Sequence, residues 1–294
     1  ASVHVQNARA SGDVFAAYKN EGETPLECLI RLKDEGFLPM SDKFTYAGRL
    51  DPMAEGLLIF LRGDAIQNKH DFLALPKEYE VEILLGVSTD TGDVLGLINS
   101  VVHGDVVFDL KNIGAVCESF IGESEVPYPW FSSKTLKGKP LYEWAREFAS
   151  EESEGDEVED KIESKVDGHN FKVDEVFEND ESREIFLRPM TKLSIKEIEF
   201  QSLSLVSKKN LLENVTNRIR KVKGDFRQEK ILRAWIDKIP VTKKDDGEYP
   251  MLKIKVKCGS GSYMRTLAEL IGEKLKAPAL AYSIKRISIG GYKI

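Results

Sequence analysis

Alternating apolar and polar residues predict two strands that each bury one face. Residues 78–85 and 252–258 both repeat with a period of two, the spacing of side chains that point to opposite sides of a strand. Glutamates occupy the polar positions of the first segment and lysines those of the second, so we expect a basic exposed face on the second strand. Residues 57–61 form a continuous apolar run and predict a short buried strand.

A helix is predicted near the start of the chain. Thr24, Pro25 and Glu27 combine an N-cap hydroxyl, a proline at the first helical position and a glutamate three residues after the cap. This combination predicts a helix start, and Gly36 is expected to end the helix. Its expected apolar stripe is Leu26, Leu29 and Ile30.

Further helices are expected on both sides of the strand at residues 252–258. Apolar residues recur at helical spacing from about Thr266. Between residues 208 and 238, two amphipathic segments separated by Gly224 predict a basic helical hairpin. Strands and helices in this order predict an α/β (α+β) fold, with a mixed, mostly antiparallel central sheet flanked by helices.

We expect a single catalytic domain over residues 1–294, with two segments of unusual composition. Residues 147–180 are rich in acidic residues and poor in large apolar ones, which is typical of a solvated loop. Residues 205–248 contain the basic hairpin. Because the formal net charge is -7, the average field repels polyanions, and nucleic-acid binding would need a local basic face.

The cysteines and histidines give no indication of a metal or redox site. Cys28, Cys117 and Cys258 are far apart and fit no metal or redox spacing, so they are expected to be buried, reduced thiols. The four histidines do not cluster, and no metal is expected. Residues 259–262 lack the spacing of a phosphate-binding loop, so no nucleotide cofactor is expected.

The location of the protein follows from what the sequence lacks. No targeting segment is apparent, and no apolar run approaches the length that spans a bilayer. We therefore expect a cytoplasmic protein with no membrane partner, and we expect it to be a monomer.

The segment around Asp51 is the most informative about chemistry. Pro52 disfavours helical geometry at Asp51, and Gly48 and Gly56 permit a close backbone approach. Asp51 should therefore lie on a tight loop beside the buried strand predicted at residues 57–61. These residues alone leave two interpretations open, and they favour the structural one, because an Asp-Pro pair is more often part of a turn than a catalytic group.

Residues 48–58, which read GRLDPMAEGLL, resemble the aspartate box of the TruB family of pseudouridine synthases. Four further segments resemble boxes of this family and follow one another in the family's order. They are residues 18–24, 77–93, 126–142 and 258–267. Residues 188–200 also resemble the strand before the last box. The similarity covers most of the chain and implies the pseudouridine synthase fold and an isomerase that acts on RNA.

The resemblance implies that Asp51 is the catalytic nucleophile. Pseudouridine formation breaks a glycosidic bond, turns the uracil and rejoins it through carbon, so a carboxylate suffices and no cofactor is needed. Arg265 would keep Asp51 ionised and oriented through a charge-assisted, bidentate pair. Tyr79 would stack on the flipped uracil, although a tyrosine on an alternating strand can also be a core residue.

The resemblance places three more residues near the substrate. Tyr263 would lie near Asp51 and Arg265 as a packing and hydrogen-bonding neighbour. Ile284 matches an apolar position that lines the base pocket, although an apolar residue there is more often ordinary core. Lys19 belongs to the first box and would support the catalytic loop rather than touch the substrate.

Three features depart from the family pattern. The family has histidine, threonine and glycine before the aspartate box, whereas this chain has Tyr46 and Ala47 before Gly48. Tyr46 can stack on RNA but cannot act as a cation near neutral pH. No C-terminal PUA domain is expected, because little sequence follows the last match.

Residues 147–180 and 205–248 look like insertions relative to the family. The basic hairpin in the second of them either supplies RNA contacts or packs on the sheet as a solvated amphipathic element.

The sequence therefore predicts a tRNA pseudouridine-55 synthase that flips and isomerises the T-loop uridine in the T-arm of tRNA. A synthase for another RNA is one alternative, and a noncatalytic RNA-binding or RNA-folding protein on the same scaffold is another. A carboxylate hydrolase would need a second carboxylate as acid or base, for which Glu55 is poorly placed. Asp51, Tyr79 and Arg265 together favour the enzyme.

Overall fold

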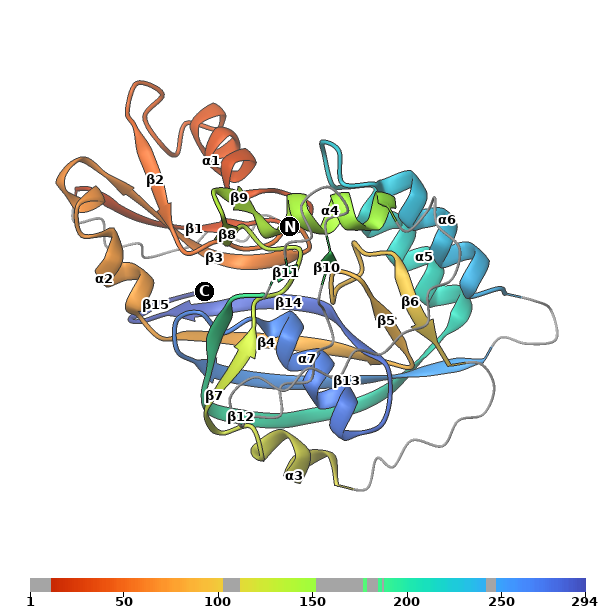
Figure 1. Ribbon diagram of the computed structural model, residues 1–294. Helices are drawn as coiled ribbons and strands as arrows, with labels where there is room; N and C mark the ends of the chain where they lie inside the picture. The colour runs from red at the N-terminus through yellow and green to blue at the C-terminus, as the bar shows by residue number, and fades with distance from the viewer. Residues whose placement is uncertain (1–11, 103–111, 152–176, 179–184, 187, 242–246) are drawn as a thin grey trace. The chain divides into compact units, whose positions relative to one another are not determined.

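The computed structural model describes residues 12–102, 112–151, 177–178, 185–186, 188–241 and 247–294 (Figure 1). The chain divides into two compact units, one of residues 1–124 with 192–294 and one of residues 125–191. Most of the acidic segment at residues 147–180 lies outside the described residues. Within the described residues, no helix is long and apolar enough to cross a membrane.

The larger unit is built on a sheet whose central strands run in the order β1-β3-β14-β4-β13-β12-β7. Neighbouring strands are antiparallel at β1–β3, β14–β4, β4–β13 and β13–β12, whereas β3 and β14 are parallel. The strands are β1 Val14–Lys19, β3 Ala54–Arg62, β14 Ala279–Ile289, β4 Lys77–Leu85, β13 Glu248–Cys258, β12 Met190–Ser207 and β7 Gly122–Pro127. This mixed, mostly antiparallel sheet with flanking helices confirms the predicted fold class.

The hydrophobic pattern predicted the main strands correctly. Strand β4 buries Tyr79 and the apolar residues that alternate with it, and leaves its glutamates half-buried. Strand β13 has the same alternation. In β3, residues 57–61 are completely buried, as expected for a strand covered on both faces. Two short strands extend the sheet, with β2 Phe44–Ala47 beside β3 and β15 Tyr292–Lys293 beside β14.

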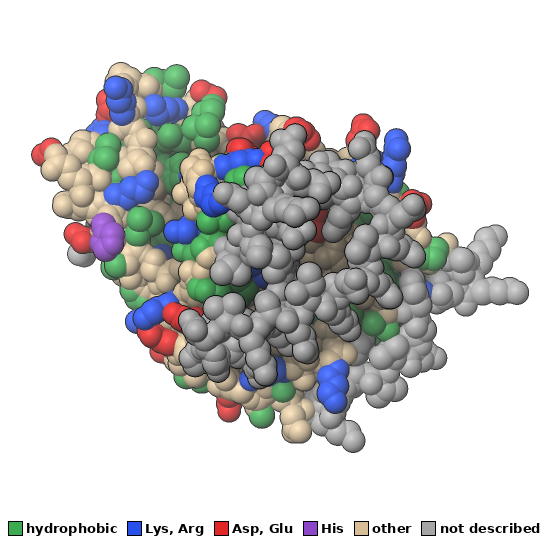
Figure 2. Space-filling view, in the orientation of Figure 1, with side chains coloured by type: hydrophobic (Ala, Val, Ile, Leu, Met, Phe, Trp, Pro, Cys, Tyr) green, Lys and Arg blue, Asp and Glu red, His purple; other side chains and the backbone are tan. Residues whose placement is uncertain are grey.

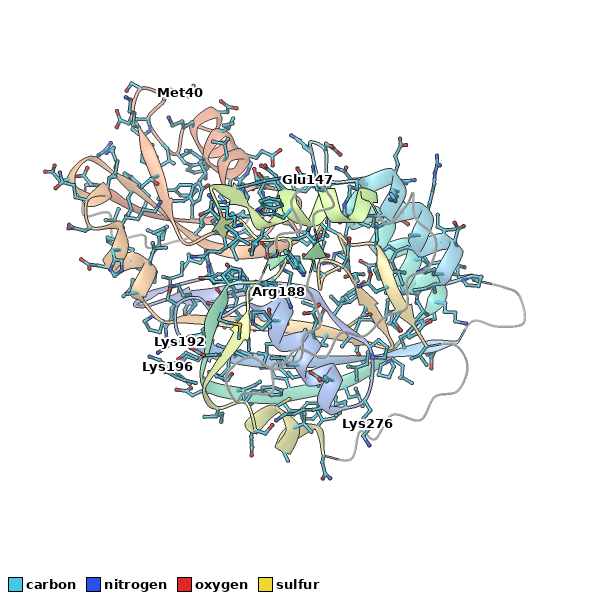
Figure 3. The ribbon with its side chains drawn as sticks, in the orientation of Figure 1. Met40, Glu147, Arg188, Lys192, Lys196 and Lys276 are labelled. Carbon is cyan, nitrogen blue, oxygen red and sulfur yellow. The ribbon has the colours of Figure 1, made fainter. Side chains whose placement is uncertain are left out.

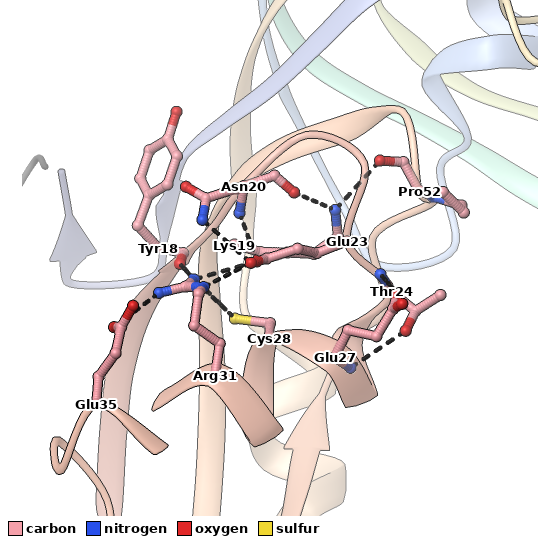
Figure 4. Close-up of polar contacts among 10 residues, drawn as sticks. All are labelled: Tyr18, Lys19, Asn20, Glu23, Thr24, Glu27, Cys28, Arg31, Glu35 and Pro52. Atoms are coloured by element: carbon pink, nitrogen blue, oxygen red, sulfur yellow. Dashed lines mark hydrogen bonds and ion pairs between the residues drawn. The ribbon is translucent and has the colours of Figure 1, made fainter. Parts of the chain in front are cut away.

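Helix α1, Pro25–Asp34, begins as predicted. Thr24 accepts a hydrogen bond from the backbone N–H of Glu27, and the Glu27 carboxylate accepts one from the backbone N–H of Thr24, so the capping box is complete (Figure 4). The predicted apolar stripe was wrong at two of three positions. Leu29 is buried, whereas Leu26 and Ile30 are exposed, because the helix turns Cys28, Leu29 and Leu32 toward Leu58 and Phe60 of β3.

The remaining helices of the larger unit are short or flank the sheet. Helix α7, Met264–Lys274, starts two residues before the predicted position and packs against β14. The shorter helices are η1 Gly63–Ile66, α2 Lys69–Ala74 and α3 Ile113–Glu118. The three cysteines are buried and free, as predicted.

The predicted basic hairpin is a pair of helices, α5 Lys208–Ile219 and α6 Gln228–Lys238. Their apolar faces share one core cluster with the hairpin of β5 Val87–Thr89 and β6 Ile98–Val101. The cluster includes Trp235 of α6, Leu95, and Met53 from the segment after Asp51. The two helices therefore pack on the sheet side that carries the Asp51 segment.

The lysines of β13 do not form the basic face that their alternation predicted. Each side chain pairs with a glutamate of a neighbouring strand: Lys253 with Glu80, Lys255 with Glu78 and Lys257 with Glu197. Lys192 of β12, labelled in Figure 3, pairs with Glu123. Figure 2 likewise shows acidic and basic side chains interspersed on the face in view. The sequence could not show this, because the partners belong to different strands.

The smaller unit contains a short hairpin, a helix and two further strands. The hairpin is formed by β8 Thr135–Leu136 and β9 Lys139–Pro140, and α4 Leu141–Glu151 follows it. The indole N–H of Trp144 donates to the Leu136 carbonyl, and the Lys139 ammonium lies 4.0 Å from the centre of the Trp144 ring. Strands β10 Phe177–Glu178 and β11 Ile185–Phe186 pair with each other.

Candidate active site

Asp51 lies in the loop that joins β2 to β3, here called the Asp51 loop (residues 48–53). The Asp51 carbonyl accepts a hydrogen bond from the backbone N–H of Ala54, the first residue of β3. Its side chain is 37% exposed, so a reactant can reach the carboxylate from solvent. The loop is therefore a tight turn against a buried strand, as the sequence predicted.

Arg265 brings its guanidinium to Asp51 from the first turn of α7. Its Nε donates to Asp51 Oδ2 over 2.8 Å, and its Nη1 donates to the Thr91 carbonyl over 2.7 Å. The Arg265 side chain is only 3% exposed. Burial lowers the pKa of Arg265, but the carboxylates of Asp51 and Asp93 outweigh this and raise it. The structure thus holds Asp51 beside a permanent positive charge.

Asp93 is a second carboxylate at this pair that the sequence analysis did not single out. Its side chain is buried and accepts hydrogen bonds from the Thr91 hydroxyl and the Leu95 backbone N–H, at 2.9 and 2.8 Å. Burial raises the pKa of Asp93, against the opposing effect of Arg265. Asp93 could have been identified from the sequence by its position inside the family box at residues 77–93.

Lys19 binds the backbone at the end of the Asp51 loop. Its side chain is completely buried, and Nζ donates to the carbonyls of Ala54, Asn20 and Pro52 at 2.5, 3.0 and 3.5 Å. Figure 4 shows Lys19 and Pro52 together. Burial lowers the pKa of Lys19 to about 8. Its contacts are with the backbone at the end of the loop and with Asn20 in the segment after β1, which supports the structural interpretation of this residue.

Arg286 of β14, the strand next to β3, binds the same loop. The sequence analysis did not identify this residue. Its side chain is 1% exposed. Nε donates to the Leu57 carbonyl over 2.7 Å and Nη1 donates to the Arg49 carbonyl over 3.2 Å. A buried guanidinium that binds backbone carbonyls fixes the loop through several donors at once. No local pattern indicates it, because its partners are more than 200 positions away.

Comparisons with known proteins find similarity in the segment that contains Asp51. The model of the TruB family pseudouridylate synthase (N terminal domain) matches residues 38–178, which contain Asp51, Tyr79 and Asp93. This segment of the chain is similar to the TruB family. Arg265 and Arg286 lie outside the matched residues, and the structure brings them to the family's segment.

Individual relatives agree with the family match. The tRNA pseudouridine synthase 4 of Saccharomyces cerevisiae is 28% identical over 266 residues, which are 84% of this chain and 60% of that protein. The tRNA pseudouridine synthase B of Cupriavidus metallidurans is 39% identical over 120 residues, which are 41% of this chain and 37% of that protein. The chain therefore spans less than two thirds of the length of these curated relatives.

A solved Cbf5-Nop10-Gar1 complex contains a chain with a similar structure. The similarity covers 96% of this chain and 50% of that chain, with 17% sequence identity and a TM-score of 0.49.

Tyr79 of β4 lies beside Arg286 of the neighbouring strand β14. The two residues are register partners on β4 and β14. Tyr79 is 8% exposed, and burial raises its pKa, while the positive charge of Arg286 acts in the opposite direction. A neutral phenol beside the loop-binding guanidinium is compatible both with stacking on a base and with a core role.

The other predicted substrate residues lie on three different elements. Ile284 of β14 is buried and pairs with Ala54 of β3, directly after the Asp51 loop. Tyr263 is the N-cap of α7, two residues before Arg265. Tyr46 of β2 has the Arg49 guanidinium 5.9 Å and the Lys69 ammonium 5.7 Å from its ring centre. Tyr46 is thus a half-buried aromatic residue that packs against the core beneath α1 and has two basic neighbours.

The donor atoms at this site suit a carboxylate reaction. Asp51 presents one reachable carboxylate, oriented by Arg265, and Asp93 stays buried behind the pair. Across the described ranges of the chain, no group of three or more histidine, cysteine, aspartate or glutamate side chains is arranged to bind a metal ion. Asp51 can act as a nucleophile toward an electrophilic carbon or as a negative charge beside a developing cation.

Proposed function

We propose that this chain is a tRNA pseudouridine-55 synthase that isomerises the T-loop uridine of tRNA. The observation that carries the proposal is the pair of Asp51 and Arg265, a part-exposed carboxylate fixed by a buried guanidinium at 2.8 Å. The family match and the names of the relatives, tRNA pseudouridine synthase 4 and tRNA pseudouridine synthase B, support the reaction class and the RNA.

In the proposed mechanism, Asp51 attacks the uridine after the base has been flipped out of the T-loop. The carboxylate becomes bonded to the base or the sugar as the bond between N1 of uracil and C1′ breaks. The uracil turns, C5 bonds to C1′, Asp51 is released, and the C5 proton is transferred to N1. Substrate and product are isomers, so the reaction needs no oxidant, reductant or water.

The neighbouring residues have separate roles in the proposal. Arg265 keeps Asp51 ionised and aimed at the substrate, and Tyr79 stacks on the extruded base with Ile284 beneath it. Tyr46, with Arg49 and Lys69 beside it, contacts the unstacked RNA. T-loop bases suit this mechanism because extruding an unstacked base costs little free energy.

The test is primer extension across a carbodiimide-treated tRNA transcript after incubation with the protein. We expect a stop at the T-loop uridine with the wild type and no stop with Asp51→Asn, which keeps the shape but loses the charge. The matched control is Asp34→Asn, the same change at an exposed carboxylate at the end of α1, which should retain the stop.

Two outcomes would contradict the proposal. Folded wild-type protein that binds tRNA and gives no stop would favour noncatalytic RNA binding. A stop in ribosomal or another RNA, but not in tRNA, would keep the isomerase chemistry and replace the substrate.

A further inference from the structure

Two basic residues at and just after the C-terminal end of α5 pair with the same carboxylate, that of Glu21. Arg218 has a side chain that is 8% exposed, and its Nε donates to Glu21 Oε2 over 2.8 Å. Its guanidinium also lies 4.6 Å from the ring centre of Tyr282 on β14. Lys221, one turn later, donates from Nζ to the other Glu21 oxygen over 3.1 Å. Both cations of this helix end are therefore paired with the segment that follows β1.

That segment contacts the Asp51 loop directly. The backbone N–H of Gly22 donates to the Pro52 carbonyl over 2.8 Å. Gly22 has a φ of +92°, and a Cβ at this position would lie 2.7 Å from the Cβ of Lys221. Only a glycine permits this close approach. A continuous series of contacts thus leads from α5 through Glu21 and Gly22 to the residue after Asp51.

Arg227, the N-cap of α6, makes a similar contact with the segment that binds Arg265. Arg227 donates from Nη1 to Asp90 Oδ2 over 2.8 Å, and Asp90 Oδ1 accepts from the Leu97 backbone N–H over 2.8 Å. The next residue, Thr91, provides the carbonyl that accepts from Arg265. Farther along α6, the Trp235 indole N–H donates to the Gly96 carbonyl.

We propose that α5 and α6 are a positioning device for the catalytic pair: Arg218 fixes the backbone next to Asp51, and Arg227 fixes the loop that holds Arg265. The inference rests on the proposed function and adds residues to its machinery. Both ion pairs are partly buried, with Glu21 15% and Asp90 21% exposed at the side chain. Ion pairs removed from water are screened less by salt than exposed ones. They can therefore keep the two loops, and with them Asp51 and Arg265, in fixed positions.

This assignment changes the role expected for the basic hairpin. Arg218, Lys221 and Arg227 are explained by protein partners and need no RNA to account for them. Lys230 and Arg233 lie on the exposed side of α6, and they are the residues through which RNA contact by the hairpin is tested. Positioning residues and RNA-binding residues can thus be separated within one helix pair.

The test compares single-turnover rate constants at saturating enzyme with dissociation constants for the same tRNA transcript. Arg227→Gln and Glu21→Gln should each lower the rate constant by about tenfold or more, because misplacement of a reacting group by an ångström costs up to about a hundredfold. The dissociation constant should change by less than about twofold. Arg218→Gln should add little to Glu21→Gln, since both remove the same contact.

The matched controls are Lys230→Gln and Arg233→Gln, which should keep the wild-type rate constant. If these two variants weaken tRNA binding while Arg227→Gln leaves the rate constant unchanged, the hairpin is an RNA-binding element and the positioning role is overturned. Equal loss in all variants would also overturn it.

Amide hydrogen exchange provides a second measurement that needs no activity. In Arg218→Gln or Glu21→Gln, the Gly22 and Ala54 amides should exchange faster than in Lys230→Gln, while amides in the centre of β4 stay protected. Should the wild type modify no RNA, the proposed function fails, and exchange still decides whether the helices fix the loops. Unchanged exchange at Gly22 and Ala54 would overturn the positioning role on its own.

Discussion

At the scale of single residues, the two donors of Arg265 explain why an arginine occupies this position. Nε binds the Asp51 carboxylate while Nη1 binds the Thr91 carbonyl. The planar guanidinium fixes the angle between these two donors, whereas a lysine offers one flexible nitrogen. Arg265 therefore fixes the orientation of the Asp51 carboxylate and also stabilises its negative charge.

We expect Arg265→Lys to lower the single-turnover rate of pseudouridine formation by about 10- to 100-fold, the equivalent of one charge-assisted hydrogen bond. The measurement is tritium release or carbodiimide primer extension over a time course. Arg233→Lys, on the exposed side of α6, is the control and should leave the rate unchanged. A fully active Arg265→Lys would show that only the positive charge matters.

Lys19 gives a prediction about pH. Its pKa falls from an ordinary value of 10.5 to about 8, mainly through burial. Between about pH 8 and pH 10.5 the unfolded chain then binds this proton and the folded protein does not, so the Lys19 contribution to stability rises with pH.

The free energy of unfolding of the wild type should therefore increase relative to Lys19→Met by about 2 kcal/mol between about pH 7.5 and pH 9.5. Urea denaturation of both proteins at the two pH values measures it. The comparison cancels the opposite contributions of the cysteine thiols, because both proteins contain them. A difference that is constant with pH would mean that Lys19 keeps its ordinary pKa in the folded protein.

At the scale of elements, the Asp51 loop depends on how closely β3 and β14 approach each other. Gly56 of β3 and Arg286 of β14 are register partners in the parallel pair. A Cβ on Gly56 would lie 2.3 Å from the Arg286 carbonyl oxygen and 2.8 Å from its backbone nitrogen. Gly56 also has a φ of +111°, which side chains rarely adopt.

Gly56→Ala should consequently destabilise the protein by more than about 3 kcal/mol and abolish activity, because two strands must separate. Gly36→Ala is the matched control: it has a φ of +78° but no atom within 4 Å of the added Cβ. It should cost only about 1 kcal/mol, the strain of the backbone alone. Thermal unfolding measures both. Equal costs would show that the sheet adjusts to the added methyl group.

At the scale of the whole molecule, a net charge of -7 means that the proposed binding of a polyanion requires a local surface. The lysines of β13 cannot supply it, since glutamates pair with them. Arg49 is exposed, lies two residues before Asp51 and has Tyr46 and Lys69 as near neighbours. RNA contact is therefore expected around the Asp51 loop rather than on the sheet.

Arg49→Met should weaken tRNA binding and reduce the slope of log affinity against log salt by about 1, the loss of one phosphate contact. Lys257→Met removes the same charge at a site where Glu197 already compensates it, and it should leave the slope unchanged. Filter binding across a salt series distinguishes the two. Identical slopes for the two variants would mean that overall charge, not this surface, governs binding.

The sequence by itself determined the local structure and the place of Asp51 in a tight loop before a buried strand. Periods of two and of 3.6 residues, the Thr24 capping box and the glycines around Asp51 act over short stretches of chain, so β4, β13, α1 and the Asp51 loop followed from neighbouring residues. The family boxes added the expectation that Asp51 and Arg265 work together. The structure brings these two side chains together across 214 positions of sequence.

Only the tertiary structure decided which charged side chains pair with other groups of the protein and which face solvent. Arg286, Arg218 and the β13 lysines look like surface cations in the sequence, yet each is committed to a carbonyl or a carboxylate from a distant segment. Asp93 is likewise a buried neighbour of the pair formed by Asp51 and Arg265. Burial and ion pairing depend on which strands and helices become neighbours in space, and the local order of residues does not specify that.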